Sequence, residues 1–207
     1  MDIERIGDML STISLPDNYF TEGAAEYLLT LFDKDFKGIM IDIGAHSNHR
    51  SNSLLLEVNG WEVFCVEPNP HCINKLIDRK HFHQLAIGAE NKDNVDFYIY
   101  HEEDEQSWTG LTNYIGISIK EIVKVKMVTL DYFLESVAKV DHVDILSIDV
   151  EGWEMEVLKG IDLDRWKVKS ICIENWEDIG EQNNYLIDKG YKKLNRIIFN
   201  NFWIKDL

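Results

Sequence analysis

Three features of the sequence predict an α/β protein with a mostly parallel sheet. Mostly apolar runs recur along the chain, most clearly at 38–43 and 143–148, and such runs are typical of strands buried on both faces. Segments with apolar residues at helical spacing lie between them. Strands that alternate with helices in this way favour a parallel sheet covered by helices. The tail, 191–205, reads as two β segments that form an antiparallel edge.

The sequence of the first half predicts two helices, followed by strands that alternate with helices. Residues 3–13 have helical spacing that ends near Pro16, and a second helix starts at about Thr21. A buried strand over 38–43 follows and ends at Gly44. Further along, the pattern predicts these elements in order: a helix over 54–58, a strand over 61–66, a helix over 72–77 and a strand over 82–87.

The second half begins with two segments that alternate as paired strands do, 95–100 and 123–128. The acidic stretch between them, 101–107, is expected to be a solvated loop. The later elements are predicted in this order: a helix over 130–137, a buried strand over 143–148, a helix from Gly152, a strand over 168–173, a helix over 179–188 that Gly190 closes, and a β pair with its turn near 200–201.

Composition and charge exclude several classes of protein. The chain has 207 residues, 45% of them hydrophobic and 28% charged, which excludes collagen-like, low-complexity and disordered chains. No apolar run approaches the length of a membrane helix, and the start of the chain lacks the pattern of a signal peptide. The net charge of −16 disfavours nucleic acid and anionic membranes as partners. Cys65, Cys72 and Cys172 form no CxxC pair, which favours reduced thiols in a cytoplasmic protein.

The ends of the predicted strands indicate a ligand site, because open α/β sheets bind ligands beyond the carboxyl ends of their strands. Gly44 follows one strand, and Glu67 ends the next. An acid at this spacing is typical of a residue that accepts hydrogen bonds from ribose. The loop 44–50 has a single glycine, whereas a dinucleotide needs G-x-G-x-x-G. The pattern favours a nucleoside without pyrophosphate, such as S-adenosylmethionine, although a turn glycine and a surface acid explain it equally well.

Longer stretches of the sequence resemble the FkbM family of methyltransferases. The matching stretches are 41–46 (IDIGAH), 51–53 (SNS), 60–61 (GW), 67–70 (EPNP), 129–131 (TLD), 144–154 (DILSIDVEGWE), 157–160 (VLKG) and 190–191 (GY). The resemblance covers residues 38–205, and 149–154 is its most specific part. The family usually has Gly at the position of Asn48, and Asn tolerates a positive φ better than other non-glycine residues.

The resemblance implies a class I, S-adenosylmethionine-dependent methyltransferase. Its Rossmann-like sheet has seven strands in the order 3-2-1-4-5-7-6, with strand 7 antiparallel and helices on both faces. The length predicts a single domain over 1–207, and the apolar spacing predicts N-terminal helices over 1–36. The resemblance implies a catalytic core over 38–205 with an inserted β segment near 94–128. The family mostly methylates hydroxyl oxygens on sugars, glycolipids and secondary metabolites.

A cofactor site follows from the resemblance and the strand ends together. Asp42 would help to hold the methionine amino group, Glu67 the ribose, and the segment 86–87 the adenine face. Loop capping by Asp42 and core packing by 86–87 are the alternatives. The expected cofactor-binding residues are Asp42, Gly44, Ala45, His46, Ser51, Glu67, Pro68, Asn69, Ala86, Ile87 and Asp149.

Carboxylates and histidines supply candidate bases. Asp149 and Glu151 end the central strand, and a carboxylate there can take the proton from an acceptor hydroxyl. His46 and His49 lie in the loop after the first strand, and an unperturbed imidazole titrates near neutrality. The residue pattern by itself favours solvated loop histidines at these two positions. The expected catalytic residues are Asp149, Glu151 and His46.

A metal ion and an acceptor surface are further hypotheses. Asp149, Glu174 and Asn175 offer oxygen ligands at two neighbouring strand ends. The arrangement is similar to the magnesium site of catechol-type O-methyltransferases and suits Mg²⁺ or Ca²⁺. The alternative is that Glu151 or Glu154 caps the following helix. Trp108, Glu174 and Trp176 are expected on the acceptor side, where aromatic rings would stack on a saccharide; partial burial of the two tryptophans in the core explains them at least equally well.

The leading hypothesis is an S-adenosylmethionine-dependent O-methyltransferase that acts on a small-molecule or saccharide hydroxyl. The second is a methyltransferase-like binding module that has lost turnover through the Asn48 loop. A nicotinamide-dependent enzyme is disfavoured by the missing glycines. The sequence leaves the acceptor, the methylated position and the oligomeric state open.

Overall fold

The computed structural model describes residues 19, 21, 23–101, 109–176, 178 and 180–206. The helix expected over 3–13 and the candidate acceptor residue Trp108 lie outside the described residues. Among the helices that are described, none has the length and apolar character that spanning a bilayer requires.

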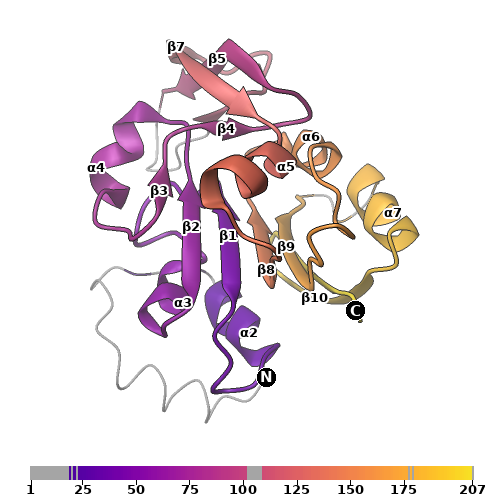
Figure 1. Ribbon diagram of the computed structural model, residues 1–207. Helices are drawn as coiled ribbons and strands as arrows, with labels where there is room; N and C mark the ends of the chain where they lie inside the picture. Colours follow the sequence, from indigo (N-terminus) through magenta and orange to yellow (C-terminus); the bar gives the residue numbers. More distant parts are fainter. Residues whose placement is uncertain are drawn as a thin grey trace.

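Seven strands form the main sheet in the order β3-β2-β1-β8-β9-β11-β10 (Figure 1). The strands are β1 (Ile39–Ile43), β2 (Glu62–Val66), β3 (Phe82–His83), β8 (Ile145–Ile148), β9 (Ser170–Glu174), β10 (Lys192–Ile197) and β11 (Asn200–Ile204). β1 is parallel to β2 and β8, whereas β11 is antiparallel to both β9 and β10. This is the order 3-2-1-4-5-7-6 with an antiparallel seventh strand, so the predicted topology is confirmed.

Helices cover both faces of the main sheet because its strands are apolar on both sides. Met40 packs in one buried cluster with residues of α2 (Ala24–Thr30) and α3 (Leu54–Val58). Ile41 and Ile43 point to the opposite face, as alternation along a strand requires. The helices are α2, α3, α4 (Ile73–Leu76), α5 (Leu130–Tyr132) with a wider turn over Phe133–Ala138, α6 (Glu154–Lys159) and α7 (Glu181–Asp188).

The expected inserted β segment forms a second sheet, which lies beyond one end of the main sheet (Figure 1). Its strands are β4 (Ala86–Ile87), β5 (Lys92–Tyr100), β6 (Thr109–Gly110) and β7 (Ile119–Val128), in the order β4-β7-β5-β6. β5 and β7 pair antiparallel, as their alternation predicts. A third core cluster fills the space beside this sheet and contains Phe97 and Met127.

Two predicted elements differ from the structure. The single strand expected over 82–87 is two strands, because β3 pairs with β2 and β4 leaves that sheet to pair with β7. The turn expected near 200–201 lies instead at 198–199, where Ile198 takes a left-handed φ of 52°. Asn200 and Asn201 therefore belong to β11, where they pair with β9 and β10.

Candidate active site

The carboxyl ends of the parallel strands border one cavity of about 710 Å³. Both sheets contribute to its wall, because β4 and β6 of the second sheet face the ends of β1, β2, β8 and β9. Ten of the residues expected at a site line it: Gly44, His46, Glu67, Pro68, Ala86, Ile87, Asp149, Glu151, Glu174 and Trp176.

Gly44 is required by the close approach of two strand ends. Its φ is 87°, and a Cβ atom there would lie 1.6 Å from the backbone oxygen of Asp149. The amide of Asp149 in turn donates to the carbonyl of Ile43 at 2.9 Å. The next left-handed residue in the loop is His46, with φ of 47°. Asn48 does not take a positive φ, so the turn does not depend on glycine at that position.

Glu67 presents a fixed carboxylate to the cavity. Its side chain is 5% exposed. One carboxylate oxygen accepts from the His46 amide at 3.0 Å, and the other accepts from the Asn69 amide at 2.8 Å. Burial raises the pKa of Glu67 to about 7. Each oxygen keeps a further acceptor position, so the geometry suits two neighbouring hydroxyl donors, as in a ribose.

Asp42 lies in a buried polar network beside the cavity. Its Oδ2 atom accepts from the hydroxyls of Ser51 at 2.7 Å and Ser53 at 2.6 Å. Arg79 donates to both hydroxyls and pairs with Glu57. Asp42 shares the face of β1 that Met40 occupies, because side chains alternate along a strand. The structure thus places Asp42 and Ser51 in this network and not among the residues that line the cavity. Ala45 and Asn69 are buried in the loops that follow β1 and β2.

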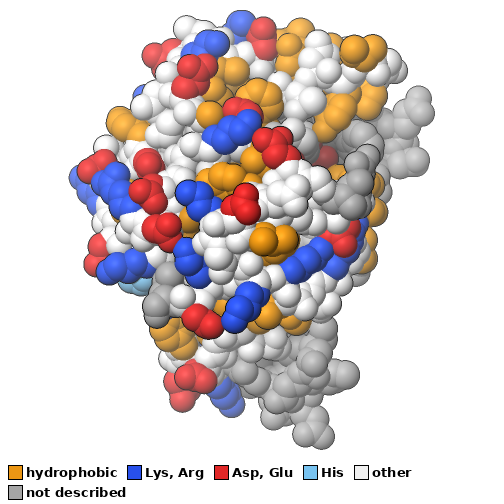
Figure 2. Space-filling model, turned by 90° about the vertical axis from the view of Figure 1, so that its right-hand side faces the viewer, with side chains coloured by type: hydrophobic (Ala, Val, Ile, Leu, Met, Phe, Trp, Pro, Cys, Tyr) orange, Lys and Arg blue, Asp and Glu red, His pale blue; other side chains and the backbone are white. Residues whose placement is uncertain are grey.

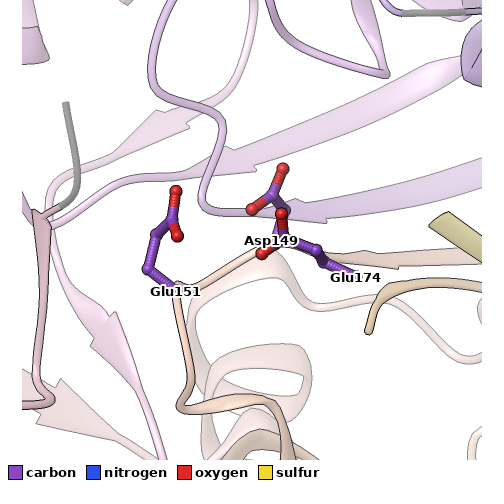
Figure 3. A group of neighbouring side chains, drawn as sticks. All are labelled: Asp149, Glu151 and Glu174. Carbon is purple, nitrogen blue, oxygen red and sulfur yellow. The ribbon is translucent and has the colours of Figure 1, made fainter. Parts of the chain in front are cut away.

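Three carboxyl groups meet at the ends of β8 and β9. Asp149, Glu151 and Glu174 each place an oxygen atom within 4.8 Å of the others, and Figure 3 shows them together. Burial and the neighbouring Glu174 raise the pKa of Asp149 well above its usual value. Burial and the same neighbour raise the pKa of Glu151 to about 8. At neutral pH the cluster therefore holds protons, and Glu151 is a stronger base than an ordinary carboxylate.

Residues 150–152, between β8 and α6, form a turn, here called the Glu151 turn, that directs the Glu151 carboxylate into the cavity. Glu151 has a left-handed φ of 53°, and Gly152 follows with 86°. Glu154 accepts from the amides of Gly152 at 3.0 Å and Val150 at 3.4 Å. Of the two acids considered as helix caps, Glu154 therefore holds the backbone, and Glu151 lines the cavity.

His46 is a poor base in this position. Burial lowers its pKa to about 4, and the positive charges of Lys75 and Arg50 contribute. One ring nitrogen lies 3.2 Å from the Ser47 hydroxyl. The neutral ring and the hydrogen bond from the His46 amide to Glu67 favour a role in the cavity wall over proton abstraction.

Trp176 forms an aromatic surface at the edge of the cavity. Its ring stacks on Phe199, with centroids 4.0 Å apart, and 48% of the residue is exposed. Asn175 differs from the expectation for a metal ligand, because its Oδ1 atom accepts from the Asp178 amide at 3.0 Å. It lines a smaller hollow of about 270 Å³ beside the main cavity, to which Glu174 and Trp176 also belong.

Several residues in the cavity wall were not singled out from the sequence. They are Thr21, Arg50, Asn52, Lys75, Leu85, Phe97, Val150, Trp153, Phe199 and Asn200; His49, a candidate base, also lines the cavity. Arg50 and Lys75 carry a usable signal, since they are basic residues next to cofactor motifs in an acidic chain. Phe97 and 109–111 reach the site because the second sheet packs there, and no local pattern indicates this for Phe97.

One comparison with known proteins identifies a family. The family described as Methyltransferase FkbM domain matches residues 42–193. "Methyltransferase sdnD" of Sordaria araneosa is 42% identical over 55 residues, which are 25% of this chain and 21% of that protein. The match therefore spans about a fifth of the length of this curated relative.

Solved structures of methyltransferases are similar at low identity. Precorrin-6y C5,15-methyltransferase from Geobacter metallireducens GS-15 is 14% identical, with 94% of each chain covered and a TM-score of 0.47. The N-terminal domain of human METTL16 in complex with SAH is 14% identical, with 86% of this chain and 66% of that chain covered and a TM-score of 0.44. Because the family match spans most of the chain, the protein belongs to the methyltransferase FkbM domain family.

Proposed function

We propose that this protein is an S-adenosylmethionine-dependent O-methyltransferase that acts on a hydroxyl of a saccharide or secondary metabolite. The observation that carries the proposal is the shared cavity. On one side, backbone amides fix the carboxylate of Glu67, and on the other, Glu151 belongs to a group of carboxyls with raised pKa values. Family membership and the name of the curated relative support methyl transfer as the activity.

The residues present fit the cofactor. The cavity of about 710 Å³ falls within the range of ligand pockets, roughly 300–1,000 Å³. In the proposal Glu67 holds the ribose hydroxyls, and the buried pair Ala86 and Ile87 faces the adenine. Arg50 and Lys75 give positive charge to the carboxylate of the methionine portion. When bound, S-adenosylmethionine supplies an electrophilic methyl group on a sulfonium.

Glu151 is the proposed proton acceptor. In its ionised form, Glu151 would take the proton that the acceptor hydroxyl loses, while S-adenosylmethionine, when bound, would supply the methyl group and leave as S-adenosylhomocysteine. A base whose pKa lies near the working pH suits this task, and the pKa of Glu151 is raised to about 8. Asp149 and Glu174 orient the hydroxyl, since methyl transfer from a sulfonium depends chiefly on positioning.

The acceptor side favours a neutral, hydroxyl-rich molecule. Trp176 offers a stacked, exposed ring, and aromatic faces of this kind pack against the apolar faces of sugars. Carboxyl groups beside the ring accept hydrogen bonds from hydroxyls. The net charge of −16 disfavours polyanionic acceptors.

Mg²⁺ is a second hypothesis for the same carboxyl cluster. Asp149, Glu151 and Glu174 provide only oxygen atoms, which are the ligands that Mg²⁺ prefers. A divalent cation there would lower the pKa of a bound hydroxyl and favour its ionisation. The assay below is therefore run with Mg²⁺ and with a chelator.

The experiment incubates the protein with S-adenosylmethionine and a panel of methyl glycosides and phenols, and mass spectrometry detects an added methyl group. We expect Glu151→Gln to slow transfer about 100-fold, the lower end for a general base. Glu156→Gln on α6 is the matched control, since Glu156 pairs with Lys159 outside the cavity. An unchanged rate in Glu151→Gln would remove Glu151 as the base. Cofactor binding by the wild type without transfer to any acceptor would favour the binding module.

A further inference from the structure

The second sheet packs directly on the Glu151 turn. β6 passes so close that a Cβ atom on Gly110 would lie 3.4 Å from the backbone oxygens of both Val150 and Glu151. Thr109, Gly110 and Leu111 also line the cavity. The segment inserted between the third and fourth strands of the main sheet therefore forms a wall next to the candidate base.

Tyr114 connects this second sheet to the turn by a hydrogen bond. Its hydroxyl donates to the backbone oxygen of Glu151 at 2.8 Å. Its own amide donates to the Tyr100 hydroxyl at 2.8 Å, and that hydroxyl donates to the Thr112 carbonyl at 2.9 Å. Tyr100 is 2% exposed and belongs to β5. The position of the Tyr114 hydroxyl is thus set by the buried part of the second sheet.

The turn needs such support because its backbone is strained. Glu151 is a non-glycine residue at φ of 53°, and a left-handed residue of this kind persists only when its surroundings hold it. Gly152 leaves the space that the Tyr114 hydroxyl occupies, since a Cβ atom there would lie 2.4 Å from it. Glu154 of α6 holds the amides of the turn from the other side.

We propose that Tyr114 is a positioning residue, whose hydroxyl keeps the Glu151 carboxylate in the cavity by holding the Glu151 carbonyl. The proposal rests on the proposed function only for the role of Glu151 as proton acceptor. Without the hydroxyl, the turn relaxes towards an ordinary φ, and the carboxylate moves away from Asp149 and Glu174. The inserted sheet then serves as a scaffold for the base as well as a wall of the site.

Amide hydrogen exchange tests whether Tyr114 holds the turn, and it needs no acceptor. Tyr114→Phe removes one hydroxyl, and we expect the Gly152 amide to exchange about tenfold faster, the effect of losing one good hydrogen bond. Tyr185→Phe is the matched control, because the Tyr185 hydroxyl donates to the Leu158 carbonyl at 3.1 Å, outside this turn. Equal exchange of Gly152 in Tyr114→Phe and the wild type would overturn the proposal.

A double-mutant cycle tests whether Tyr114 acts through Glu151. With an acceptor found in the glycoside and phenol panel, Tyr114→Phe should lower kcat about tenfold and leave the acceptor KM and the cofactor Kd unchanged. In a Glu151→Gln background the same change should cost less than about twofold. Equal losses in both backgrounds would contradict the coupling. If the wild type neither binds nor uses S-adenosylmethionine, the proposed function is wrong. In that case the hydrogen-exchange result still decides whether Tyr114 holds the turn.

Discussion

Gly44 shows how a single position couples two strands. An added Cβ atom would lie 1.6 Å from the Asp149 carbonyl, so Gly44→Ala forces the ends of β1 and β8 apart. We expect it to lower the free energy of unfolding by at least about 3 kcal/mol, from overpacking and backbone strain together. Gly116→Ala is the control, since Gly116 has φ of 93° and open space around its Cβ position; it should cost only about 1 kcal/mol. Urea unfolding measures both, and equal losses would contradict the close approach.

Glu67 should make the stability of the protein depend on pH. Burial raises its pKa from 4.5 to about 7 in the folded chain. Below pH 4.5 Glu67 is protonated in both the folded and the unfolded protein. Between pH 4.5 and about 7 it is protonated only in the folded protein. The unfolding free energy therefore falls as the pH rises through this range, by up to about 3 kcal/mol.

Unfolding experiments at several pH values compare the wild type with Glu67→Gln. In Glu67→Gln, the fall in unfolding free energy between pH 4.5 and about 7 should be smaller than in the wild type. The control is Glu90→Gln, at an exposed position next to the second sheet, which should show the same fall as the wild type. If the unfolding free energy of Glu67→Gln depends on pH as that of the wild type does, the pKa of Glu67 is not raised in the folded protein.

At the scale of elements, a buried cation joins the loop after β1 to α3. Arg79, which follows α4, is 6% exposed and donates to Ser51 and Ser53, and it pairs with Glu57 of α3. Arg79→Met leaves the buried acids of this network without their cation, so we expect a loss of about 3 kcal/mol in unfolding free energy. Lys80→Met is the matched control, because Lys80 is exposed and its ion pair contributes at most about 1 kcal/mol. Equal stability of the two variants would contradict this account.

Most helices and strands could be predicted from the sequence, but the sheet to which β4 belongs and the direction of the Asp42 side chain could not. The segment 82–87 reads as one strand because four of its six residues are apolar and Gly88 follows, and only pairing with Met127 and Val128 shows that β4 belongs to a second sheet. Asp42 ends up beside the cavity and not in its lining, because strand alternation directs it towards Ser51 and Ser53. Local spacing cannot reveal the place of β4, since its partners Met127 and Val128 lie about 40 residues away in the sequence.

At the scale of the whole molecule, the order of the main sheet could be predicted because buried parallel strands have a strong local signature. The strand ends then converge, which is why Glu67, Asp149 and Glu174 were found from sequence. The packing of the second sheet on the Glu151 turn could not be found, because it depends on contacts of Gly110 and Tyr114 across a long separation. Figure 2 shows acidic and basic side chains interspersed on one face, so the net charge of −16 is not gathered there into a single patch.

Calorimetric titration with S-adenosylmethionine and S-adenosylhomocysteine tests the central claim most directly. We expect the wild type to bind both with micromolar affinity, and Glu67→Gln to weaken binding at least about tenfold, since hydrogen bonds to a charged group are lost. Glu90→Gln should bind as the wild type does. The absence of both binding heat and a thermal shift at millimolar cofactor would contradict the account, because Glu67 and the Gly44 turn would then not form a cofactor site.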